Sequence, residues 1–206
     1  PSGPRWLSVP CGPDEHRLIC EVSLQDHRWQ RSHWDIIRAC YRAAPFYSRY
    51  ERFLAEVYLE REWTTLSELN QTLIRQIARE FLGITTDFGD SRDYLLQGSK
   101  VDRLLNLLRS CGATDYLSGP TARDYRDPAV FERAGIRVAW MDYSGYLEYP
   151  QLYPPFAHRV SILDLLLMTG PDAPRYMLSF SSHSPVVQTA RQHLDSVAIE
   201  PSLVWA

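Results

Sequence analysis

Gly98, Ser99 and Lys100 form the stretch whose residue types are best suited to chemistry. The sequence has 22 lysines and arginines, and Lys100 is the only lysine among them. Ser99 is predicted to cap a helix that has Asp102 at its third position. Free backbone N–H groups, the helix dipole and an ammonium would there favour a phosphate or a carboxylate. The spacing of a Walker A loop is absent, and a capped helix with an exposed lysine explains the same residues.

A second group follows a predicted short strand, where Ser118 and Gly119 begin a turn that leads to Asp124 and Tyr125. Ligands bind beyond the carboxyl ends of parallel strands, so this turn is a candidate catalytic position. Ser118 has no G-x-S-x-G context that would indicate a nucleophile, and it can simply hydrogen-bond the turn. Asp124 is either a general base or hydroxyl acceptor, or the cap of the next helix.

A third group lies in a proline-rich loop, where Tyr149 and Gln151 could bind a sugar or a base by stacking and hydrogen bonds. Packing of the loop itself explains the aromatic residues equally well. His33 is a further substrate-binding candidate. It shares a helix face with Trp29 and Ile37, which favours a buried histidine with its hydrogen bonds satisfied.

The composition limits the classes of function. The net charge of −3 disfavours nucleic-acid binding through the overall charge of the protein. No apolar stretch is long enough to span a membrane. The four cysteines are scattered, which favours free thiols in a reducing compartment, and we expect a cytoplasmic protein. No histidine has metal-ligand spacing, so no metal site is predicted, and the cofactor stays unassigned.

The positions of the apolar residues predict an α/β fold, with a mostly parallel sheet, flanking helices and a helical insertion of about three consecutive helices. We expect one domain over 1–206, with a helical lobe at 29–82, a βαβ part at 84–170 and an irregular tail at 171–206. Two further short strands are expected at 6–10 and 18–24. Apolar positions and a glycine-proline stop predict a helix over 161–168, with Asp164 inside it.

Several segments, taken in order, resemble the WbqC-like protein family. They read RWLSVP, WQRSHWDIIRACYRAAPFYSRY, LNQTLIRQIAREFLGI, GSKVDRLLNLLRSCGATDYLSGPTARDY and YPQLYPPFAHRVSILDLLLMTG. They extend from Trp6 to Gly170. An upstream segment that the family carries, with His-Gln-Pro and Leu-Pro-Trp-x-Gly motifs, is not seen before the first matching segment.

The resemblance implies a bacterial biosynthetic protein of the kind encoded in O-antigen, polysaccharide and related secondary gene clusters. It implies a transferase that moves a glycine-like aminoacyl or similar small group onto a sugar-type or other acceptor. Lys100, Asp124 and Ser118 would be the catalytic candidates, and a nucleotide sugar or an activated amino acid the partner. A homo-oligomer is possible. The alternative is a non-catalytic binding protein whose helical lobe presents a partner surface.

Overall fold

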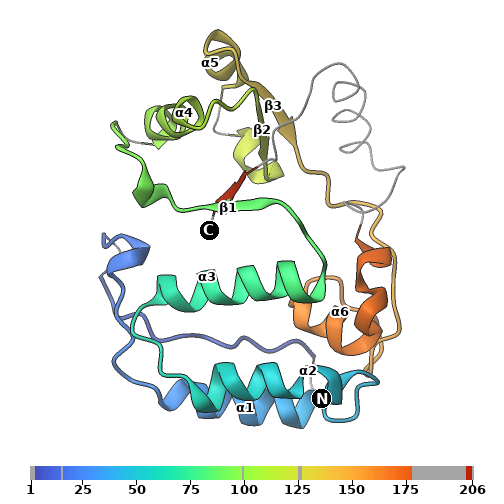
Figure 1. Ribbon diagram of the computed structural model, residues 1–206. Helices are drawn as coiled ribbons and strands as arrows, with labels where there is room; N and C mark the ends of the chain where they lie inside the picture. The colour runs from blue at the N-terminus through green and yellow to red at the C-terminus, as the bar shows by residue number, and fades with distance from the viewer. Residues whose placement is uncertain (1–2, 15, 99, 125–126, 178–202, 206) are drawn as a thin grey trace. The chain divides into compact units, whose positions relative to one another are not determined.

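A computed structural model describes residues 3–14, 16–98, 100–124, 127–177 and 203–205. The chain forms two compact units (Figure 1). The first combines Pro1–Thr85 with Leu147–Tyr176, and the second combines Thr86–Tyr146 with Met177–Ala206. The mixed α/β class predicted from the sequence is confirmed, because helices and parallel strand pairs both occur. The expected partition of one domain into lobe, βαβ part and tail stays a prediction.

The first unit is helical. Its helices are α1 (Arg28–Tyr41), α2 (Tyr47–Ala55), α3 (Leu66–Gln76) and α6 (Ile162–Thr169), and α1 and α2 lie side by side (Figure 1). The apolar positions of α1 recur every three or four residues, so Trp29, Trp34 and Ile37 are buried together. The three consecutive helices predicted from the sequence are therefore present.

Helix α2 ends in a wider turn, a π-helix over Glu56–Glu60. The Val57 carbonyl accepts hydrogen bonds from Gln30 Nε2 at 3.1 Å and from Trp63 Nε1 at 2.8 Å. The Arg61 N–H bonds the carbonyl of Glu56, five residues earlier, instead of that of Val57. Side chains that compete for a helix carbonyl thus coincide with the π-turn. A second π-helix, Ile77–Phe81, follows α3.

Helix α3 begins as the sequence predicts. The Thr65 hydroxyl accepts a hydrogen bond from the Glu68 N–H at 3.1 Å. The Glu68 carboxylate instead accepts hydrogen bonds from the Thr64 N–H and hydroxyl. The reciprocal bond of a capping box is therefore displaced by one residue.

The two strands expected near the N-terminus are wrong. Residues 6–10 are not in a strand, and Ile19–Glu21 is a 3₁₀ helix. A single antiparallel bridge joins Ser23 to Thr65. Only Val22 and Leu24 of the alternating residues are buried, whereas Leu18 is 57% exposed. A strand needs a partner along its length, and here pairing is limited to one bridge.

Helix α6 carries the longest buried apolar run of the first unit. The Ser161 hydroxyl accepts a hydrogen bond from the Leu163 N–H and caps it, and Gly170 ends it with φ +57°. The predicted helix and its glycine stop are both present. A 3₁₀ helix, Gly170–Tyr176, follows. The Phe46 N–H donates to the Leu167 carbonyl at 3.0 Å, which attaches the start of α2 to α6.

The second unit contains two parallel strand pairs. Strand β1 (Asp87–Gly89) pairs with β4 (Leu203–Trp205), and β2 (Asp115–Ser118) pairs with β3 (Arg137–Trp140). In the second pair Asp115 lies opposite Arg137 and Ser118 opposite Trp140. Helix α4 (Lys100–Ser110) connects β1 to β2, and α5 (Pro128–Arg133) precedes β3. Helix α5 lies between the paired strands β2 and β3, and a helical crossover of this kind is what a parallel pair requires.

Leu105 and Leu108 of α4, Phe131 of α5 and Ile136 form the core of the second unit. The Tyr116 ring of β2 stacks on Phe131, with ring centroids 5.6 Å apart. One face of β2 is therefore covered by helices. This packing fixes the ends of α4 and β2, where the sequence placed its main candidates.

In the described part of the chain, no helix is both long and apolar enough to cross a membrane.

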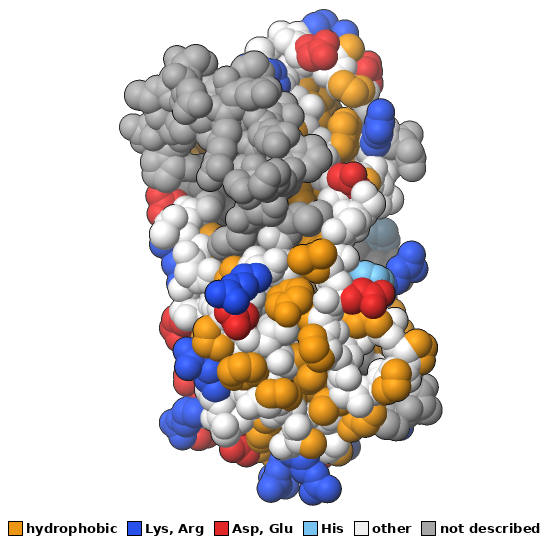
Figure 2. Space-filling view, turned by 90° about the vertical axis from the view of Figure 1, so that its right-hand side faces the viewer, with side chains coloured by type: hydrophobic (Ala, Val, Ile, Leu, Met, Phe, Trp, Pro, Cys, Tyr) orange, Lys and Arg blue, Asp and Glu red, His pale blue; other side chains and the backbone are white. Residues whose placement is uncertain are grey.

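In the space-filling view, hydrophobic side chains gather over the helical unit (Figure 2). Exposed large hydrophobic residues of that unit include Trp6, at 95%, and Leu147, at 60%. Such groups on a surface are compatible with contact to another molecule.

Candidate functional site

The start of α4 has an unusual backbone. Lys100, its first residue, has φ +49° and is the only non-glycine residue with positive φ in the described ranges. This left-handed conformation costs about 1–2 kcal/mol for a residue with a Cβ atom. Strained backbone conformations persist where their surroundings hold them, and they cluster at functional sites. The lone lysine therefore stands at a structurally distinctive position.

Gly98 brings the chain close to the helix. A Cβ atom at this position would lie 2.8 Å from the Cβ of Asp102, and Gly98 already has φ +79°. The Gln97 N–H donates to Asn106 Oδ1 at 3.4 Å, so the chain passes along α4 before it reverses. Only glycine fits this approach. The predicted cap, Ser99, lies outside the described residues.

Charge at this helix start comes from two side chains. Lys100 is exposed and makes no ion pair with any residue that the structure describes. Asp102 lies in the first turn, where its carboxylate stabilises the helix dipole. An anion bound here would gain from the Lys100 ammonium and be opposed by Asp102. Binding of a phosphate or a carboxylate at this position stays a prediction.

Ser118 was expected to begin the turn after the strand, but it is the last residue of β2, and it is 6% exposed. Its hydroxyl accepts a hydrogen bond from the Tyr116 hydroxyl at 3.2 Å. The Met141 N–H donates to the Ser118 carbonyl at 2.8 Å, which joins the carboxyl ends of β2 and β3. This geometry agrees with a serine that supports the turn.

Gly119 lies beside the loop that follows β3, because a Cβ atom there would lie 3.9 Å from the Tyr143 hydroxyl. Asp124 is the last residue of the 3₁₀ helix Pro120–Asp124. Its side chain and all of Tyr125 lie outside the described part. The structure thus brings Gly119 close to Tyr143, and Gly98 close to the first turn of α4.

Tyr149 and Gln151 belong to the first unit and converge on Asp164. The Tyr149 hydroxyl and Gln151 Nε2 donate to Asp164 Oδ2 at 2.7 and 2.8 Å, and the Tyr41 hydroxyl donates to Oδ1 at 2.8 Å. Asp164 is 6% exposed. Three neutral donors, together with the first turn of α6, compensate this buried carboxylate.

Asp164 and its donors Tyr41, Tyr149 and Gln151, here called the Asp164 cluster, attach the loop over 147–158 to α6. Gln151 also donates to the Ala157 carbonyl at 3.1 Å and accepts from the Ala157 N–H at 2.8 Å. Its amide is therefore fully used by the loop and by Asp164 of α6. Burial, followed by the hydrogen bond to Asp164, raises the pKa of both Tyr41 and Tyr149. These tyrosines remain neutral donors at physiological pH.

Asp164 is the residue whose importance the sequence left undetected. Its signal was a lone carboxylate inside an otherwise apolar helix. A buried charge usually has partners, so such a residue marks a polar cluster. Its partner Tyr41 could not be identified from spacing, because 123 residues separate them.

His33 is buried on α1, as the sequence favoured. Its ring lies 5.0 Å from Trp29 and 6.0 Å from Tyr58, as centroid distances. Burial lowers the pKa of His33, and a backbone hydrogen bond with Ser8 acts in the opposite direction. The net effect favours the neutral imidazole.

The lowered pKa of His33 predicts a pH-dependent stability. The unfolded histidine takes up a proton near pH 6.5, while the folded one resists it. The stabilisation is therefore complete above pH 6.5 and is lost as the pH falls toward the folded pKa. Urea unfolding measures how far the free energy of unfolding falls between pH 7.5 and pH 5.0. This fall should be smaller for His33→Gln than for the wild type. An equal loss in both proteins would contradict the assignment.

No group of three or more histidine, cysteine, aspartate or glutamate side chains is placed to hold a metal ion within the described ranges.

The candidate residues from the sequence fall into two sets, one in each unit. The first set, in the second unit, comprises Gly98, Lys100, Ser118 and Gly119, with Ser99, Asp124 and Tyr125 adjacent in sequence. The second set, in the first unit, comprises His33, Tyr149 and Gln151.

Comparison with known proteins agrees with the resemblance noted in the sequence. A sequence model described as the WbqC-like protein family matches residues 1–176. The chain is 41% identical over 177 residues to Uncharacterized protein Rv1507c of Mycobacterium tuberculosis. The aligned region covers 85% of this chain and 76% of that protein. No solved structure matches. This chain belongs to the WbqC-like protein family.

Proposed function

We propose that this protein is a biosynthetic transferase that moves an aminoacyl, glycine-like or similar small group onto a sugar-type acceptor. The observation that carries the proposal is the start of α4, where Lys100 has a left-handed conformation and no ion pair among the described residues, two positions after the tightly packed Gly98. Membership of the WbqC-like family supports a biosynthetic role, as the resemblance implies. We further propose that the protein acts in the cytoplasm.

In this proposal Lys100, Gly98 and Ser99 hold a phosphate or carboxylate of the donor. An amine of the acceptor attacks the acyl carbon, a nitrogen–carbon bond forms, and the bond to the leaving group breaks. Asp124 takes the proton from the amine, and the leaving group departs with its negative charge beside Lys100. Ser118, Gly119 and Tyr125 shape the pocket.

Tyr149, Gln151 and His33 have different proposed roles. The first two position the loop over 147–158 through Asp164, because their polar atoms already serve internal hydrogen bonds. His33 is held neutral among aromatic rings and supports α1.

Ligand-induced thermal stabilisation tests the site. We expect ATP, a nucleotide sugar or an aminoacyl phosphate to raise the melting temperature of the wild type. Lys100→Ala should weaken that ligand about tenfold or more, because a hydrogen bond to a charged group contributes about 1.5–3 kcal/mol. Arg103→Ala removes a positive charge from an exposed position of the same helix and should retain the shift. Absence of any shift, or a full shift in Lys100→Ala, would refute the site.

A second candidate function is a non-catalytic binding protein, which the exposed hydrophobic residues of the helical unit favour. Trp6 and Ile19, at 95% and 63% exposure, would then contact a protein partner or a second copy. Light scattering after size exclusion, with wild type and Trp6→Ser/Ile19→Ser, distinguishes the two. A mass above that of the monomer, lost in the double variant, would favour this alternative.

A further inference from the structure

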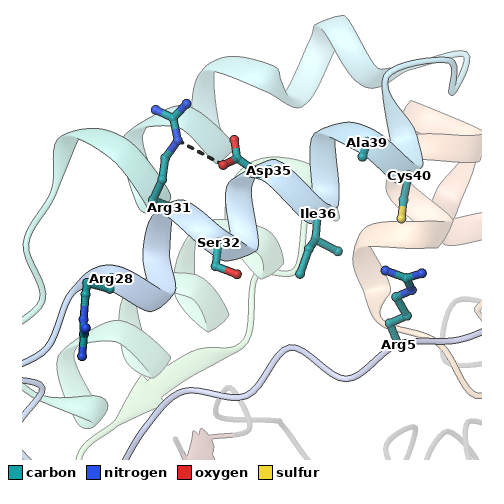
Figure 3. Close-up of a pocket in the computed structure, with 8 residues that line it drawn as sticks. All are labelled: Arg5, Arg28, Arg31, Ser32, Asp35, Ile36, Ala39 and Cys40. Carbon is teal, nitrogen blue, oxygen red and sulfur yellow. Dashed lines mark hydrogen bonds and ion pairs between the residues drawn. The ribbon is translucent and has the colours of Figure 1, made fainter.

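A groove of about 540 Å³ runs along α1, next to the chain segment that contains Arg5 (Figure 3). This volume is within the range of about 300–1,000 Å³ that small-molecule sites occupy. The groove belongs to the first unit and is separate from the Lys100 proposal. None of the candidates from the sequence lies in its lining.

Two neighbouring rows of α1 residues line the groove, and the second row consists of Arg31, Asp35 and Ala39. Arg28, Ser32, Ile36 and Cys40 recur every four residues, so they share one face of α1. The row spans about 18 Å at 1.5 Å per residue. Ser32 and Ile36 point toward the side on which Arg5 lies, while Arg31 and Asp35 point to the opposite side (Figure 3). The wall therefore combines a hydroxyl with apolar surface.

The charged groups of the groove differ in whether they are already paired. Both carboxylate oxygens of Asp26 accept from Arg28, at distances of 2.7 to 3.1 Å. These bonds lower the pKa of Asp26 to about 2, so the pair stays ionised at neutral pH. Arg31 bonds Asp35 at 3.2 Å. Arg5 has no acidic partner among the described residues.

From this difference we infer that the groove binds a small ring-bearing oxyanion, either a carboxylate or a phosphate. The oxyanion pairs with the planar guanidinium of Arg5, which suits two-point contact with such groups. The ring lies over Ile36 and Cys40, and the Ser32 hydroxyl hydrogen-bonds its polar edge. The Arg28–Asp26 and Arg31–Asp35 pairs are each neutral overall, so Arg5 leaves the groove with one positive charge that a bound anion can neutralise.

An NMR titration of the ¹⁵N-labelled full chain with benzoate and with phenyl phosphate tests this site, and benzyl alcohol serves as the neutral ring. Amide shifts should gather at Arg5, Ser32 and Ile36 with at least one oxyanion and stay absent with the alcohol. The tighter of the two oxyanions identifies the carboxylate or the phosphate source. Shifts that lie elsewhere, or equal shifts with the alcohol, would overturn the inference.

Two matched variants separate a specific site from general attraction to positive charge. Arg5→Gln should weaken binding about tenfold or more, because it removes the unpaired guanidinium. Arg31→Gln should stay within about twofold, since its charge is paired and directed away. Equal weakening by both variants would contradict the site. Lys100→Ala should leave this affinity unchanged, so the two proposals can fail independently.

Discussion

Asp164→Ala is expected to lower the free energy of unfolding by about 3 kcal/mol, because it removes the common acceptor of three side chains. The hydroxyls of Tyr41 and Tyr149 and the amide of Gln151 all converge on this buried carboxylate. Without the Asp164 carboxylate, each of the three donors must hydrogen-bond to water or stay unsatisfied. The loop over 147–158 would then separate from α1 and α6. Urea unfolding followed by circular dichroism measures the loss.

Two further variants define the origin of this effect. Asp164→Asn keeps the size of the side chain but replaces one acceptor oxygen with a donor, so an intermediate loss is expected. Asp35→Ala removes an exposed carboxylate of α1 with a single ion pair, and it should cost at most about 0.5 kcal/mol. Equal losses in Asp35→Ala and Asp164→Ala would show that the Asp164 cluster does not stabilise the fold.

Gly170→Ala is expected to destabilise the first unit by about 3 kcal/mol. Gly170 has φ +57°, and a Cβ atom there would overlap the ring of Phe46. Overpacking of this kind costs about 1–3 kcal/mol, and a left-handed conformation adds about 1–2 kcal/mol. The Phe46 backbone is fixed by its hydrogen bond to Leu167, so the ring has limited freedom to withdraw.

Gly83→Ala provides the control for Gly170→Ala. Gly83 also has positive φ, at +65°, but open space surrounds the position of its missing Cβ. The Gly83→Ala variant should therefore lose only the conformational cost, about 1 kcal/mol of the free energy of unfolding. Adding Phe46→Ala to Gly170→Ala removes the clashing ring, and the double variant should lose less than the sum of the single losses. Strict additivity would argue against the contact.

The sequence predicted the helices well because each helix satisfies its backbone hydrogen bonds locally. Trp29 and Ile37 mark one face of α1, and Thr65 caps α3. The N-terminal strands failed because alternation alone does not supply a partner strand. Leu18 and Ile19 are exposed, and only Ser23 forms a bridge. Strand prediction depends on distant residues, and local patterns do not reveal them.

The candidate site was predicted in part. The sequence indicated a helix start at Lys100, and this start is present, whereas Ser118 ends β2 and does not begin the following turn. It did not indicate the left-handed backbone of Lys100, because residue types alone do not predict a positive φ at a residue other than glycine. Tyr149 and Gln151 were noticed for their chemistry, but only tertiary structure shows that Asp164 engages both.

Product formation tests the proposed transferase most directly. Purified protein is incubated with a glycyl phosphate or glycyl thioester donor and a nucleotide-linked amino sugar, and the acceptor is analysed by mass spectrometry. Wild type and Arg103→Ala should both add one glycyl group to the acceptor, whereas Lys100→Ala should slow this by about tenfold or more. An acceptor left unmodified by the wild type, or modified equally fast by Lys100→Ala, would contradict the account.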